Sequence, residues 1–146
     1  MMTDLPAREA FTAFVKGCGK WWHASYSHHG APQALSIDWE KACILKQLPN
    51  RSFVRHLKLA NYHPQNITPC FTSGLGPPQE TGVDGAMTVE TTELDKRTQI
   101  QALYSVTGYS KQQLNKLALI VDRVLNDQFT QLQNSCTKLN IVLEKS

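Results

Sequence analysis

A stripe of apolar residues runs through the last third of the sequence at steps of three and four. It extends from Leu114 to Leu143, and neither Pro nor Gly interrupts it. Such spacing places the residues on one face of an α-helix. The pattern therefore predicts a long amphipathic helix over residues 110–143, roughly 50 Å in length at 1.5 Å per residue. Part of so long an apolar face needs a packing partner.

Three shorter apolar stripes occupy the first 67 residues. Each begins near a residue that can cap a helix, and each ends near a Gly or Pro. The first predicted helix spans about residues 4–17, with Thr3 or Asp4 as the cap. The second begins at Ser36 or Asp38 and ends at Leu48, and the third begins at Asn50 or Ser52 and ends before His63. Together they predict a small basic helical domain over residues 1–67.

Residues 68–91 have the composition of a connector. They contain three prolines and four glycines, and they include acidic residues but no Lys or Arg. A long stretch without a regular element is uncommon inside one domain. We therefore predict a Gly/Pro-rich acidic linker at residues 68–91.

Residues 92–146 predict a helical hairpin. Ile100, Leu103 and Tyr104 have the spacing of a helix that precedes the long one. Gly108 suits the left-handed position after a helix end, and Ser110 with Gln113 forms a capping box for the second arm. A helix-turn-helix is a weaker alternative, because a recognition helix is normally far shorter. The predicted fold is thus mainly α: an N-terminal helical segment, a Gly/Pro-rich linker, and a C-terminal helical hairpin with one long amphipathic helix.

The net charge of +3 is small, but the charges are unevenly distributed. Two basic segments, residues 1–70 and 96–146, flank the acidic connector. In the first segment, basic residues mix with aromatic ones, a combination that can bind phosphates and stack on bases. The purely structural interpretation is that the tryptophans fill a hydrophobic core and the lysines lie on the solvated surface. The residues predicted to bind nucleic acid are Lys16, Lys20, Arg51, Arg55, Lys58, Lys111 and Lys116.

These patterns predict a non-enzymatic subunit or regulator that associates with DNA or RNA and assembles through its long helix. The alternative is a structural protein that acts by protein–protein interaction without nucleic acid, with or without a zinc-stabilised N-terminal domain. In both cases the long helix forms a homo-oligomer or binds a larger protein. The residues predicted to mediate this assembly are Leu114, Val121, Leu125, Phe129, Leu132 and Leu139.

Cysteines and histidines concentrate in the first half of the chain. Zinc prefers tetrahedral sets of Cys and His, so Cys43 could form a site with two or three of the following residues: Cys18, His23, His28, His29, His56, His63 and Cys70. No Cys-x-x-Cys or His-x-x-x-His pair provides the close spacing of such sites. We therefore assign no metal ligand and no cofactor. Asp38 and Glu40 lie two apart and would not share a helix face, so we also assign no catalytic residue and predict no enzyme.

The sequence predicts a cytoplasmic protein with no membrane partner. The longest unbroken apolar run, Leu117 to Val121, is too short to span a bilayer. The first residues lack the basic start and apolar core of a signal peptide. The four cysteines are widely and irregularly spaced, which favours reduced thiols over a disulfide framework.

Overall fold

The computed structural model describes residues 1–27, 31, 34–63, 65, 68–72, 82–109 and 113–144. Within these residues, a seven-stranded antiparallel sheet has the order β1-β7-β6-β5-β4-β3-β2. The strands are β1 (Met2–Thr3), β2 (Leu35–Asp38), β3 (Cys43–Gln47), β4 (Phe53–His63), β5 (Thr68–Thr72), β6 (Val83–Leu94) and β7 (Arg97–Gly108). The helices are α1 (Ala7–Lys16), α2 (Cys18–Trp21), the 3-10 helix η1 (Ala24–Tyr26) and α3 (Leu114–Glu144).

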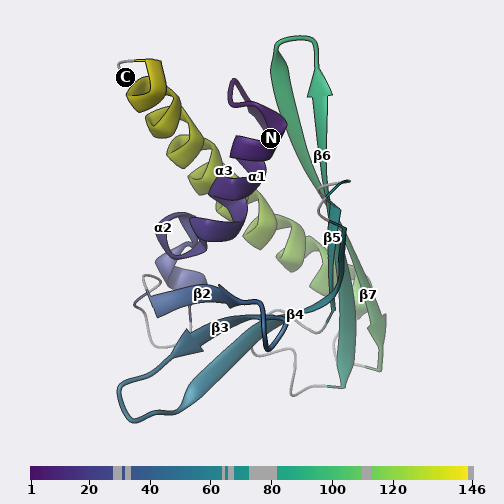
Figure 1. Cartoon of the computed structure of the whole chain (residues 1–146). Coiled ribbons are helices and arrows are strands. Elements are labelled where there is room, and N and C mark those ends of the chain that lie inside the picture. Colours follow the sequence, from purple (N-terminus) through teal and green to yellow (C-terminus); the bar gives the residue numbers. More distant parts are fainter. Residues whose placement is uncertain are drawn as a thin grey trace.

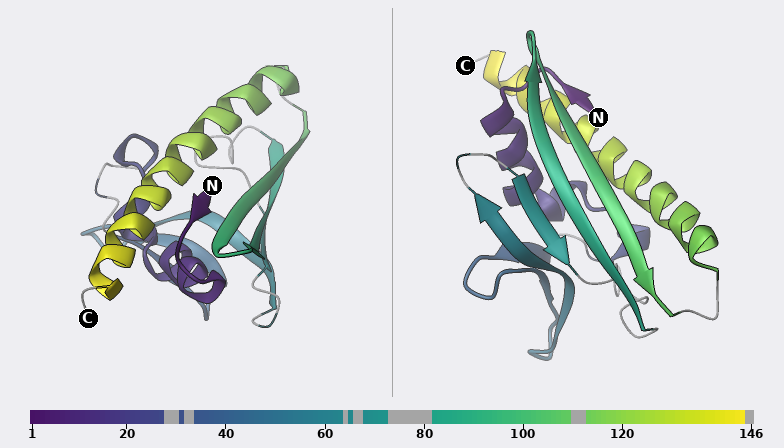
Figure 2. Two further views of the ribbon diagram at one scale, coloured as in Figure 1. Left: turned by 90° about the horizontal axis from the view of Figure 1, so that it is seen from above. Right: turned by 90° about the vertical axis from the view of Figure 1, so that its right-hand side faces the viewer.

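The sheet is strongly bent, and the helices lie on its inner side. In Figure 1, β2 and β3 run across the view while β6 and β7 stand upright, and β4 leads from one part to the other. Helix α3 contacts β7 and β1 of the sheet and packs against α1 and α2. Figure 2 shows α3 passing along the inner side of the β6–β7 hairpin. The three predicted segments, residues 1–67, 68–91 and 92–146, all contribute strands to this one sheet.

The prediction of a mainly α protein is wrong in the first segment, where two predicted helices are strands. Residues 38–48 contain the last residue of β2, the turn that follows it and all of β3. In this turn the Asp38 carboxylate accepts a hydrogen bond of 2.8 Å from the Lys41 backbone N–H. A helix cap uses the same kind of bond, so the local signal does not distinguish a helix start from a turn. Residues 52–62 fall in β4, where two register shifts break the alternation that identifies a strand.

The predicted linker and the predicted first arm of the helical hairpin are also strands. β5 and β6 fall largely in residues 68–91, and β7 replaces the arm; residues 73–81 lie outside the described part. Every second residue of β6 faces inward, from Val83 through Met87 to Val89. The β6–β7 turn places Asp95 at φ 55°, a left-handed conformation that Asp tolerates. Two long antiparallel strands therefore occupy the place of the hairpin's first arm.

Helices α1 and α3 confirm two predicted helices. α1 begins after Pro6, and the Gly17 N–H closes it by donating to the Ala13 carbonyl at 3.0 Å. The predicted caps do not act there, because Thr3 lies in β1 and Asp4 forms an ion pair with Arg97. α3 runs uninterrupted for 31 residues. No helix in the described part of the chain combines the length and apolarity needed to cross a membrane.

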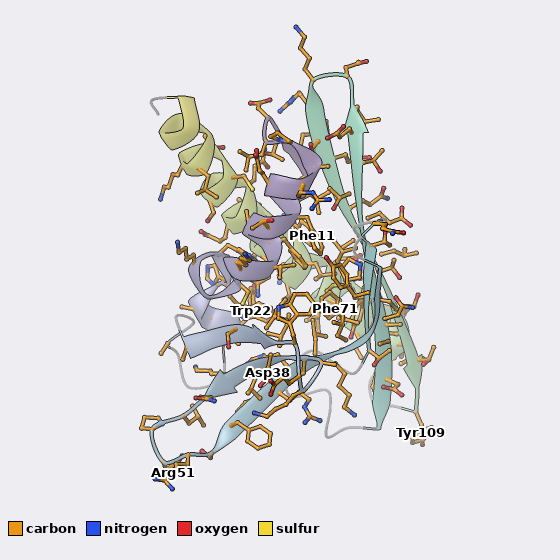
Figure 3. All side chains as sticks on the ribbon, in the orientation of Figure 1. Phe11, Trp22, Asp38, Arg51, Phe71 and Tyr109 are labelled. Carbon is orange, nitrogen blue, oxygen red and sulfur yellow. The ribbon has the colours of Figure 1, made fainter. Side chains whose placement is uncertain are left out.

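The hydrophobic core lies between the inner face of the sheet and the helices. Phe11, Trp22 and Phe71 converge there from α1, the residue after α2, and β5 (Figure 3). The Phe14 ring stacks on Trp21 at a centroid distance of 5.3 Å and meets Phe71 edge-on at 6.3 Å. Such pairs add about 0.5–1.5 kcal/mol each to the free energy of unfolding beyond area burial. The aromatic cluster fixes α1 and α2 on the sheet.

Candidate functional site

Lys46 is a lysine whose side chain is buried on the core side of the sheet, with 1% of the residue exposed. It pairs with Leu35 of β2 and Val54 of β4, and it shares a face with the core residue Ile44 because both lie on β3 two residues apart. Burial lowers the pKa of the Lys46 ammonium below its ordinary value of 10.5. A buried cation is costly to a fold, so Lys46 is a candidate for function.

Ser27 and the neighbouring His56 extend this buried polar region. The Lys46 ammonium donates a hydrogen bond of 3.0 Å to Ser27 Oγ. His56 is the extra residue of a β-bulge, because Ile44 pairs with Leu57 while Leu45 pairs with Arg55. Its ring is 1% exposed and meets the Trp22 ring edge-on at 5.3 Å. The bulge thus places an imidazole inside the protein on the strand next to Lys46.

The segment from Trp22 to Ser27 connects this region to α3. The His23 backbone N–H donates to Gln128 Oε1 at 2.6 Å, and the Tyr26 hydroxyl donates to Asp127 Oδ2 at 2.6 Å. The second bond raises the pKa of Tyr26, since the carboxylate stabilises the protonated phenol. Gln128 is 4% exposed, and its Nε2 has no hydrogen-bond partner among the described residues. An unpaired buried amide costs about 1–3 kcal/mol, which marks a second polar group available to a bound molecule or water.

An open depression borders Lys46 at the β3–β4 hairpin. Its volume of about 850 Å³ lies in the range of roughly 300–1,000 Å³ typical of small-ligand sites. Among the described residues that line it, Lys46 is the only charged one. The lining residues are Ala31, Ala34, Lys46, Gln47, Leu48, Pro49, Asn50 and Ser52. The arrangement can bind an amphipathic molecule, with apolar walls and a cation at the inner side.

The residues predicted to bind nucleic acid do not form one surface. Lys16 and Lys20 are exposed on α1 and α2, on the inner side of the sheet, and Arg51 lies at the tip of the β3–β4 hairpin (Figure 3). Arg55 and Lys58 pair with Leu45 and Cys43, which places them on the opposite face from Lys46. Lys116 lies in the first turn of α3, and Lys111 lies outside the described residues.

The residues predicted for assembly face this protein's own core. Val121 and Leu132 are buried, and Leu125 and Phe129 pack against the core cluster. Leu114 is partly buried, whereas Leu139 is 43% exposed. The partner that the apolar stripe of α3 requires is therefore largely the domain itself. A further role of this helix in assembly stays a prediction.

The cysteines and histidines give no metal site in the described part of the chain, where no three His, Cys, Asp or Glu side chains gather for an ion. Cys18 packs in the core and its thiol donates to the Leu35 carbonyl at 3.5 Å. Cys43 is buried in β3. His28 and His29, considered for zinc, lie outside the described residues.

Comparisons with known proteins define the fold. No protein-family model matches the sequence, and no curated protein matches it. The structure is similar to the crystal structure of Ara h 8.0201, with a TM-score of 0.60 and 15% sequence identity over 94% of each chain. It also resembles the di-domain ARO/CYC protein StfQ from the steffimycin biosynthetic pathway, with a TM-score of 0.55 and 12% identity. That match covers 96% of this chain and 44% of StfQ.

The chain has a Bet v1-like fold. This finding and the seven-stranded sheet overturn the prediction of a mainly α protein. They also overturn the predicted nucleic-acid-associated function, since neither the fold nor the placement of the basic residues indicates such a role. Lys46, Ser27 and Gln128 were not singled out from the sequence. The neighbours of Lys46 gave no clear signal, because residues 43–48 mix apolar side chains with Lys46 and Gln47.

Proposed function

We propose that this protein binds a small amphipathic organic ligand in the depression at the β3–β4 hairpin, without converting it chemically. Proteins with this fold typically bind ligands. The observation that carries the proposal is Lys46, a buried lysine on the core face that borders a depression whose other described lining residues are uncharged. Binding sites for small molecules combine mostly apolar walls with a few polar groups in this way.

Cys18 and Cys136 offer no activated nucleophile. Burial raises the pKa of the Cys18 thiol and of the Cys136 thiol. Both sulfurs are therefore protonated at neutral pH, and a protonated thiol is a poor nucleophile. The two thiols are thus not activated in the way that a catalytic cysteine is.

Fluorescence titration with Nile red, an uncharged apolar dye, tests the proposal. We expect saturable binding at one site and displacement of the dye by decanol. Ala34→Trp, a change at an exposed residue of the depression, should abolish binding because the indole fills the space. Ser36→Trp is the matched control, since Ser36 is exposed and pairs with Leu45 on the other face of the sheet. Equal binding by both variants would refute the location, and no saturable binding by the unmodified protein would refute the function.

A further inference from the structure

Strand β7 is an edge of the sheet over most of its length. In Figure 2, β1 accompanies β7 only near the β6–β7 turn, where it pairs with Thr98 and Gln99. The Ile100 N–H then donates to the Met1 carbonyl at 2.9 Å, and the Ile100 carbonyl accepts from the Met1 amino group at 2.7 Å. Beyond Ile100, no described strand lies on this side of β7. The outer edge of β7 is therefore open over residues 101–107.

The backbone groups at this edge can be assigned from the alternation of an antiparallel ladder. β7 pairs with β6 without a register shift, so its backbone groups point alternately toward β6 and away from it. Ala102 and Val106 alternate in step with Ile100, and their N–H and C=O groups therefore point away from β6. Neither residue has a hydrogen bond on that side within the described part of the chain. Two donors and two acceptors are thus available to another strand.

The side chains of β7 do not hinder such pairing. Exposed edge strands are commonly protected by charged residues, by Pro or by being short. The opposite edge strand, β2, has only four residues and ends at Asp38, which forms an ion pair with Lys41. β7 has twelve residues, and the sequence from Thr98 to Tyr109 contains no charged residue and no Pro. β7 therefore lacks the features that protect β2 from association.

We propose that two copies of this protein pair through β7 in an antiparallel dimer, with the two-fold axis between their Tyr104 residues. The open stretch is centred there: β1 ends opposite Ile100, and at Gly108 the chain leaves the strand with φ 117°. Ala102 and Val106 lie two residues to either side of the axis, so Ala102 of each copy faces Val106 of the other. All four groups in each copy are then hydrogen-bonded, and no like charges meet. Because both copies use the same edge, the assembly closes at two chains.

Light scattering after size-exclusion chromatography tests the proposal on the unmodified protein. As the protein concentration increases through the micromolar range, the molar mass should rise from 16.4 kDa toward twice that value. A mass of one chain at every concentration would overturn the proposal. A mass that grows beyond two chains would also overturn it, because a two-fold pairing leaves no second edge of this kind.

Two substitutions then assign the interface to β7. Val106→Pro removes an N–H that β6 does not use, so the dissociation constant of the dimer should rise about tenfold or more, the effect of two hydrogen bonds lost across the axis. Leu103→Lys, at a residue that is 69% exposed, places two like charges near the axis and should also weaken the dimer. Leu94→Lys is the matched control, because Leu94 is 45% exposed and lies at the β6–β7 turn, outside the paired stretch.

Circular dichroism confirms that each variant is folded, and Leu103→Lys decides the matter if Val106→Pro does not fold. We expect the dimer of Leu94→Lys to be as stable as that of the unmodified protein. A dimer that Leu103→Lys leaves unchanged, or that Leu94→Lys weakens equally, would overturn the assignment to the β7 edge.

Amide hydrogen exchange measured by NMR follows the same bonds in the unmodified protein. The N–H groups of Ala102 and Val106 should exchange about tenfold or more slowly in the dimer than in the monomer, because hydrogen-bonded amides are protected. The N–H of Leu103 points toward β6 and serves as the internal control, with similar protection in both states. Equally fast exchange of Ala102 and Val106 in monomer and dimer would show that the copies associate elsewhere.

Discussion

Leu132→Ala should be among the most destabilising single changes in α3. Leu132 is fully buried and belongs to the core cluster that α1, α2 and the sheet share. The substitution removes three carbon atoms, which at about 0.8 kcal/mol per buried methylene costs about 2.4 kcal/mol in transfer free energy. The cavity that remains raises the expected loss to about 3–5 kcal/mol. In a chain of this size, the midpoint of thermal unfolding should fall by roughly 10 °C.

Urea denaturation, followed by both circular dichroism and tryptophan fluorescence, measures this loss. Leu119→Ala is the matched control, because Leu119 lies in the same helix but is 68% exposed. Its free energy of unfolding should change by less than about 0.5 kcal/mol. A loss below about 1 kcal/mol for Leu132→Ala, or equal losses in the two variants, would show that α3 does not pack on the sheet through this face.

Three further predictions concern backbone strain, pH and thiol reactivity. Gly108→Ala should lower the free energy of unfolding, measured by urea denaturation, by roughly 3 kcal/mol, and Gly82→Ala should lower it by roughly 1 kcal/mol. Both glycines have positive φ. A Cβ at Gly108 would lie 2.6 Å from the Gly82 carbonyl oxygen, whereas the nearest described atom to a Cβ at Gly82 is 3.6 Å away. Equal costs would contradict this contact. Because the folded protein lowers the pKa of Lys46 from 10.5, the unfolded state binds more protons between the folded-state value and 10.5, and the free energy of unfolding should rise with pH across that window. Lys46→Met should flatten this rise relative to the unmodified protein, and an unchanged slope would argue against the buried charge. Brief treatment of the native protein with a thiol reagent, read by mass spectrometry, should modify the partly buried Cys70 first, since Cys18, Cys43 and Cys136 are buried; rapid modification of all four would indicate that the core opens readily.

The two correctly predicted helices, α1 and α3, each have an apolar stripe that no Pro or Gly interrupts. Pro6 and Gly17 flank the first stripe, and Gly108 precedes the second. The strands were missed although β7 carries a strand signal: Thr98, Ile100 and Ala102 alternate with polar neighbours and face inward or partly inward. Ile100, Leu103 and Tyr104 also fit a helical step, but Leu103 is 69% exposed on the other face of the sheet. With Leu103 on the solvent side, the apolar residues of β7 fit a helical spacing as well as the alternation of a strand.

The candidate site was harder to predict from the sequence than the strands, because the register of the strands decides which side chains face the core. Lys46 and Lys58 both lie in short runs of mixed apolar and polar residues, and nothing in their neighbours assigns one to the interior. The difference follows from pairing: Lys46 is level with the inward residue Leu35, whereas Lys58 is level with Cys43 on the other face. The bulge at His56 reverses the alternation along β4, which local sequence does not indicate.

The pairing of β1 with β7 sets the order in which the chain can fold. Met2 pairs with Gln99, and the Met1 amino group donates to the Ile100 carbonyl at 2.7 Å, so β1 has no strand partner until almost a hundred further residues exist. At about 5–20 residues per second, synthesis of that stretch takes roughly 5–20 s. During this time the apolar face of α1 lacks the strands and α3 against which it packs in the finished protein. Phe11 and Phe14 therefore lack most of their packing partners for seconds while the chain is being synthesised.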